Sequence, residues 1–84
     1  MFKNKTANGR NNICGEKIYT MRKSHIPKMS QRILAEKMQI EGIDVDKNAI
    51  QRMESGQRFI TDIELTFLSA ALGKTYDELL NIYR

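Results

Sequence analysis

A short polar run near the middle of the chain carries the side chains best suited to reading another molecule. Within residues 47–54, two cationic and two amide side chains fall on one face of a predicted helix, opposite Ile50 and Met53. These four are Lys47, Asn48, Gln51 and Arg52. In the major groove of DNA, basic side chains can donate to guanine and amides can pair with adenine, while Ala49 could touch a thymine methyl. From composition alone, a helix face that is merely solvated explains the same residues equally well.

The composition limits the classes of protein to which this chain can belong. Its 84 residues are enough for one small domain. Lys and Arg outnumber Asp and Glu by 14 to 10, so the formal net charge is +4. This charge favours a polyanionic partner without identifying one.

The sequence offers no recognisable catalytic or metal-binding set. Cys14 has no second cysteine with which to form a disulfide, and the single histidine, His25, does not complete a zinc-ligand cluster. There is no phosphate-binding glycine loop and no nucleophile with a recognisable base. We therefore expect no enzymatic activity, no cofactor and no metal. The lone cysteine and the lack of a long apolar stretch or secretory signal predict a soluble protein of the cytoplasm.

The first twelve residues are predicted to form a flexible basic arm, because they hold almost nothing apolar. The arm carries Lys3, Lys5 and Arg10, which could follow a phosphate backbone or enter the minor groove. Disorder without a DNA role is the alternative. Residues 13–84 are expected to form the folded domain.

Cap and stop residues predict five helices and no strand in that domain. Helices are expected at about 13–23, 30–42, 47–54, 61–73 and 75–83. The N-cap candidates are Ser30, Asp46, Thr61 and Thr75, the last two in capping boxes with Glu64 and Glu78, and the terminating residues are Pro27, Gly42, Gly56 and Gly73. Apolar residues at helical spacing, including Ile40, are expected to face the core.

Several short motifs occur in a characteristic order along the chain. They are Ser30-Gln31, Leu34-Ala35, Ile50, the run Arg52 to Gly56, and the apolar residues from Leu65 to Leu80. Over about residues 13–81 this order resembles the Cro/CI phage-repressor family, also called the xenobiotic-response-element type. The resemblance implies an all-α, compact five-helix bundle, a lambda-repressor-like DNA-binding domain whose second and third helices form a helix-turn-helix. Between Ser30 and Glu54 the chain is roughly five residues longer than the usual helix-turn-helix spacing, and we place the extra residues around 39–44.

The resemblance also implies roles outside the third helix. The family residue that matches Gln31 binds a DNA phosphate, at a helix start that already favours anions, and Ser30 shares that position. The counterparts of Arg22 and Glu54 pair with each other inside the domain. The loop after the third helix adds three polar residues that could clamp the DNA backbone: Ser55, Gln57 and Arg58.

Together these features predict a sequence-specific double-stranded DNA-binding transcriptional regulator, by analogy a repressor. Because one short helix covers about half of an operator, we expect a homodimer at least on DNA. The candidate pairing residues are Phe59, Phe67, Tyr76 and Tyr83, which could instead complete the core. The alternative function is a protein-binding module, such as an antitoxin of the same fold, and a regulatory protein partner stays open.

Overall fold

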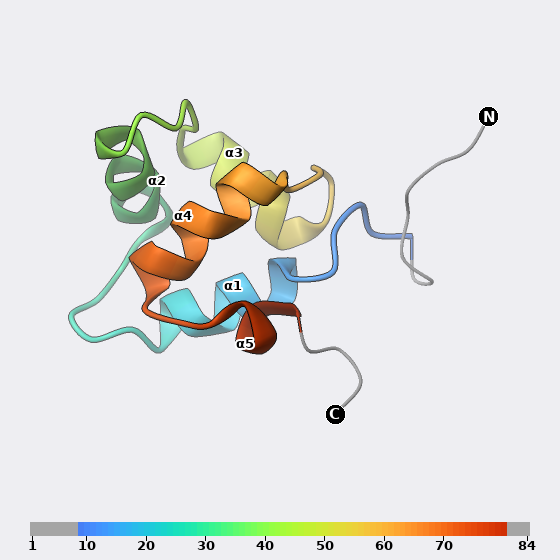
Figure 1. Cartoon of the computed structure of the whole chain (residues 1–84), viewed down its shortest axis with the longest axis horizontal. Helices are drawn as coiled ribbons and strands as arrows, with labels where there is room; N and C mark the ends of the chain where they lie inside the picture. Colours follow the sequence, from blue (N-terminus) through green and yellow to red (C-terminus); the bar gives the residue numbers. More distant parts are fainter. Residues whose placement is uncertain (1–8, 81–84) are drawn as a thin grey trace.

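The computed structural model describes residues 9–80 and shows five α-helices there, with no strand in that range. The helices are α1 (Gly15–Lys23), α2 (Gln31–Ile40), α3 (Lys47–Ser55), α4 (Asp62–Leu72) and α5 (Tyr76–Leu80). In Figure 1, α4 runs across the middle of the molecule, with α2 and α3 along one side and α1 and α5 along the other. The expected all-α, compact five-helix architecture is therefore observed over this range. None of these helices is long and apolar enough to cross a membrane.

The predicted caps lie at the helix ends because each satisfies backbone groups that a helix leaves unpaired. The side chains of Ser30 and Asp46 accept hydrogen bonds from the third backbone N–H beyond them, at 3.1 and 2.8 Å. Thr61 and Glu64 form the complete capping box ahead of α4. At the other ends, Gly56 closes α3 with φ +84° and Gly73 closes α4 with φ +67°. Both angles lie in the left-handed region that glycine adopts without steric cost.

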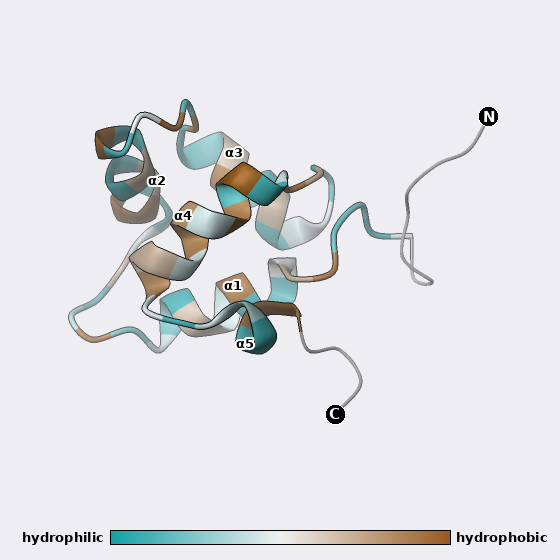
Figure 2. Cartoon of the chain, in the orientation of Figure 1, coloured by the Kyte–Doolittle hydropathy of each residue, from teal (hydrophilic) through white to brown (hydrophobic). Residues whose placement is uncertain are grey.

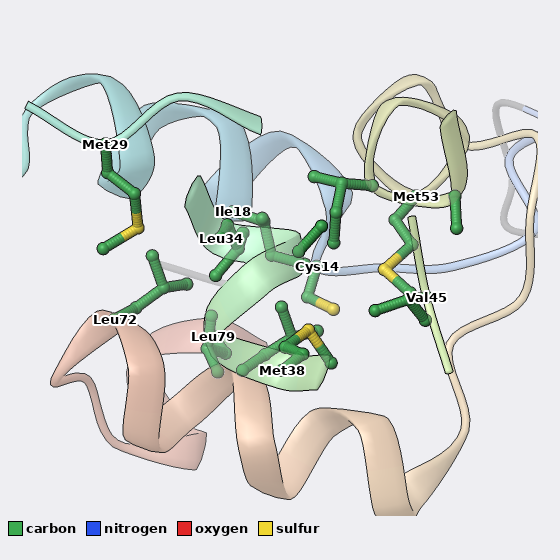
Figure 3. Close-up of a cluster of buried hydrophobic side chains, with 13 residues drawn as sticks. Cys14, Ile18, Met29, Leu34, Met38, Val45, Met53, Leu72 and Leu79 are labelled. Carbon is green, nitrogen blue, oxygen red and sulfur yellow. The ribbon is translucent and has the colours of Figure 1, made fainter. Parts of the chain in front are cut away.

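The core gathers apolar side chains from all five helices (Figure 3). Ile18 of α1, Leu34 and Met38 of α2, and Met53 of α3 are completely buried. Leu72 and Leu79 close the cluster from α4 and α5. In Figure 2, brown hydrophobic and teal hydrophilic bands alternate along the helices. The amphipathic faces predicted for the five helices are thus packed together.

Two predicted details near α1 and α2 differ from the structure. The first helix begins at Gly15 rather than at about residue 13, and Ile13 is 41% exposed. Ile40 was expected on the inner face, but it is 81% exposed, because α2 ends there and the chain turns at Glu41 and Gly42. Val45 supplies the buried contact of the connection to α3 instead.

Candidate nucleic-acid interface

The outward face of α3 brings together four of the five predicted base-reading residues. Lys47, Asn48, Gln51 and Arg52 are all exposed, at positions that share one side of the helix. Neither an acidic residue nor a large apolar residue lies between them on this side. The carboxylate of Asp46, at the start of the helix, accepts a hydrogen bond from the backbone of Ala49. The face therefore presents two cations and two amides.

Ala49, which the sequence grouped with these four residues, does not belong to that face. It is 8% exposed and belongs to the buried cluster with Ile50 and Met53. The helical rotation places residue 49 about 100° beyond residue 48, which is enough to carry it from the outer to the inner side. The outward face, named here the α3 polar face, consists of Lys47, Asn48, Gln51, Arg52 and Ser55.

Buried polar contacts hold the inner side of α3 against α1 and the start of α2. The guanidinium of Arg22 donates to both carboxylate oxygens of Glu54, at 2.6 and 3.0 Å, and to the backbone oxygen of Met29 at 3.2 Å. The Arg22–Glu54 pair that the resemblance implied is thus present, with both side chains less than a tenth exposed. The ring of Tyr19 lies 5.5 Å from the guanidinium carbon. The pair fixes the inner side of α3 rather than offering charge to a ligand.

Gln31 takes part in the same network. Its amide nitrogen donates to Glu54 at 3.0 Å, so α1, α2 and α3 meet at one carboxylate. An amide NH₂ group has two hydrogens, and the second can serve a phosphate at the start of α2. Ser30 caps that helix through Ile33, and this role is compatible with an anion at the same end.

The remaining predicted phosphate contacts lie at the end of α3 and in the loop after it, and they fall into two groups. Ser55 belongs to the α3 polar face, and Gln57 is exposed just after the end of the helix. Arg58 instead turns to α4, where its two terminal nitrogens donate to the two carboxylate oxygens of Glu64 at 2.9 and 2.8 Å. Burial disfavours the charged form of Glu64, but the hydrogen bonds from Arg58 and Thr61 outweigh it and lower the pKa of the carboxyl group. The structure thus gives Arg58 a structural partner that its predicted phosphate role did not anticipate.

Residues 10–12 close the C-terminal end of α3, where a flexible arm was expected. Asn12 donates from its amide to the backbone oxygens of Met53 and Arg58, at 2.9 and 2.8 Å. Arg10 donates to the backbone oxygen of Glu54 at 2.6 Å, and Asn11 donates through its backbone to Gly56 at 2.8 Å. The carbonyls at a helix end otherwise lack partners within the protein. Lys3 and Lys5 of the expected arm lie outside the described residues.

This closing segment, residues 10–12, was missed because its contacts cross more than forty positions of sequence. One local signal was readable: the Asn12 side chain accepts from the backbone of Gly15 at 2.7 Å, in the three-residue spacing of an N-cap. Gly15 permits the close approach, since a β-carbon there would lie 2.1 Å from the backbone oxygen of Met53.

The cysteine thiol and the histidine imidazole lie apart from the α3 polar face. Cys14 is 2% exposed in the core, and burial raises the pKa of its thiol. His25 lies in the loop after α1, with its Nδ1 atom 2.8 Å from the backbone oxygen of Pro27. Residues 9–80 contain no group of three or more His, Cys, Asp or Glu side chains that could hold a metal ion.

Comparison with known proteins adds no relative to this description: no family model, no curated protein and no solved structure matches the chain.

Proposed function

We propose that the chain is a sequence-specific DNA-binding regulator that reads base edges with the α3 polar face. The observation that carries the proposal is the gathering of Lys47, Asn48, Gln51 and Arg52 on the outer side of one short helix, with the inner side fixed. The major groove admits an α-helix, and these are the side-chain types that match guanine and adenine there.

In this proposal α2 and α3 act as a helix-turn-helix. The start of α2 lies next to α3, because Gln31 contacts Glu54, and its first-turn amides supply a place for a phosphate. Phosphate contacts from Ser30, Gln31, Ser55 and Gln57 would orient α3 without reading sequence. Regulation of transcription, and repression in particular, is the role that the resemblance to Cro/CI proteins suggests for such a domain.

The test is selection of bound sequences from a random duplex library at near-physiological salt. The wild-type protein is compared with an Asn48→Ala, Arg52→Ala double variant, which truncates two exposed side chains and should leave the fold intact. A Lys74→Ala variant, altered in the α4–α5 connection, serves as the matched surface control. We expect an enriched motif for wild type and control that is lost in the double variant.

Two results would contradict the proposal. One is a motif that the double variant selects as strongly as wild type, because base reading would then lie elsewhere. The other is no enriched motif from well-folded wild-type protein. The second result would favour the protein-binding alternative.

A further inference from the structure

A shallow groove runs between the last turn of α2 and the middle of α4. It has a volume of about 290 Å³ and is lined by Lys37, Ile40, Glu41, Phe67, Ala70 and Ala71. None of these residues belongs to the α3 polar face. The groove, named here the α2–α4 groove, is therefore a separate surface of the molecule.

Exposed apolar side chains lie in and beside the α2–α4 groove. Ile40 is 81% exposed although it ends an amphipathic helix whose inner residues are buried. Beside it, Phe67 packs partly on the core and the two alanines offer little bulk. Ile63, one turn before Phe67 on α4, is 61% exposed. Neighbouring exposed apolar side chains of this kind mark contact surfaces more often than isolated ones do.

The charges beside the groove are balanced in sign. Lys37 lies in the last turn of α2, Glu41 is the C-cap residue four positions later, and both line the groove with Ile40. Within residues 9–80 neither of them makes an ion pair, whereas Arg32–Glu36 and Lys74–Glu78 at the same spacing do. Both charges thus stay available to another molecule.

We infer that the α2–α4 groove joins two copies of this chain about a two-fold axis. In a two-fold contact the same surface serves both partners, so each residue pair occurs twice. If the two α2 ends cross in opposite directions, Lys37 of each copy meets Glu41 of the other, and Ile40 of each copy packs against the other's Phe67 and Ala71. One cation and one anion per copy fit this self-pairing, whereas a partner of a single charge sign would leave one of them unmatched.

The inferred pair differs from the pairing surface predicted from the sequence. Phe67 is shared, but Phe59 and Tyr76, which are about half exposed, lie outside the α2–α4 groove, and Tyr83 lies outside the described residues. The pair does not depend on the proposed DNA binding, because the groove and the α3 polar face share no residue.

Sedimentation in the absence of DNA, over a concentration series reaching the millimolar range, tests the inference. A small contact predicts a weak dimer. We expect the wild-type protein to dimerise, and Lys37→Glu and Glu41→Lys each to weaken the dimer at least tenfold because like charges then face each other. An equimolar mixture of these two variants should recover wild-type affinity. In the mixed dimer one copy has glutamate at both positions and the other has lysine at both, so each of the two contacts again joins opposite charges.

Further variants separate the groove from nonspecific charge effects. Ile40→Ser should abolish the dimer, while Ile26→Ser, at a loop residue that is 92% exposed, should not change it. Lys74→Glu gives the same charge change away from the groove and should also leave the dimer intact. Helical circular dichroism confirms that each variant is folded. A wild-type protein that stays monomeric throughout, an Ile40→Ser protein that dimerises like wild type, or a variant mixture that fails to recover affinity would each overturn the inference, whatever the DNA selection shows.

Discussion

At the residue scale, Glu54 connects three helices through one carboxylate. It accepts two hydrogen bonds from Arg22 and one from Gln31, and it is 7% exposed. A buried ion pair adds little stability compared with well-packed apolar residues, because removing both charges from water is costly. Losing one partner is a different matter, since the other charge is then buried alone.

We therefore expect Arg22→Met to lower the free energy of unfolding by about 3–5 kcal/mol, measured by urea denaturation. Arg32→Met is the matched control, because Arg32 pairs with Glu36 at an exposed site, where such a pair contributes less than about 1 kcal/mol. The double variant Arg22→Met, Glu54→Leu should be more stable than Arg22→Met alone. A loss no larger than that of the control would show that the buried pair is not needed for stability.

Glu64 gives the stability a dependence on acid. Its pKa in the folded protein is lowered, despite burial, by hydrogen bonds from Arg58 and Thr61. An unfolded glutamate titrates at about 4.3, so this stabilising contribution is complete above that pH and is lost as the pH falls through the lower folded value. We expect Glu64→Gln to be less stable than wild type near neutral pH and to lose less stability on acidification. Urea midpoints measured between about pH 6 and pH 2 test this, and an unchanged slope relative to an exposed Glu36→Gln control would contradict it.

At the element scale, the helices show which features can be read from a sequence. Ser30, Asp46 and the Thr61–Glu64 box were predictable because a cap acts within three residues of itself. The exposure of Ile40 could not be predicted, because the helical spacing of apolar residues does not show at which residue the helix ends. The closing segment could not be predicted either, because its contacts with the end of α3 join residues that are far apart in the sequence.

The closing segment should contribute to stability through one residue above all. Asn12→Ala removes the side-chain partner of the Arg58 backbone oxygen and of the Gly15 N–H, whereas the Met53 oxygen still accepts a hydrogen bond from the Gly56 N–H. Unsatisfied buried groups cost about 1–3 kcal/mol, so we expect a loss of that size in the free energy of unfolding. Asn11→Ala is the matched control, since its side chain bonds to Gln57 at an exposed position. Equal effects of the two variants would mean that burial at Asn12 does not matter.

At the scale of the whole molecule, the net charge is unevenly distributed along the chain. All ten acidic residues but only eleven of the fourteen basic residues lie within residues 9–80, so this part carries a formal charge of +1 against +4 for the full chain. With Arg58 paired to Glu64, the other predicted phosphate contacts are uncharged side chains. If the protein binds DNA as proposed, attraction to residues 9–80 would therefore depend on a few local cations, chiefly those of the α3 polar face.

The salt dependence of DNA binding tests this conclusion. A cation that displaces one counterion contributes about 0.9 to the slope of log affinity against log salt concentration. An ammonium group in the major groove lies within a Debye length, about 10 Å at 0.1 M salt, of phosphates on both walls. We therefore expect Lys47→Gln to reduce the slope by about 0.9 per bound copy, and Arg58→Gln, measured below its unfolding temperature, to leave it unchanged, because Arg58 is already neutralised by Glu64. A slope reduced by Arg58→Gln but not by Lys47→Gln would instead place the loop after α3, and not the α3 polar face, against the DNA backbone.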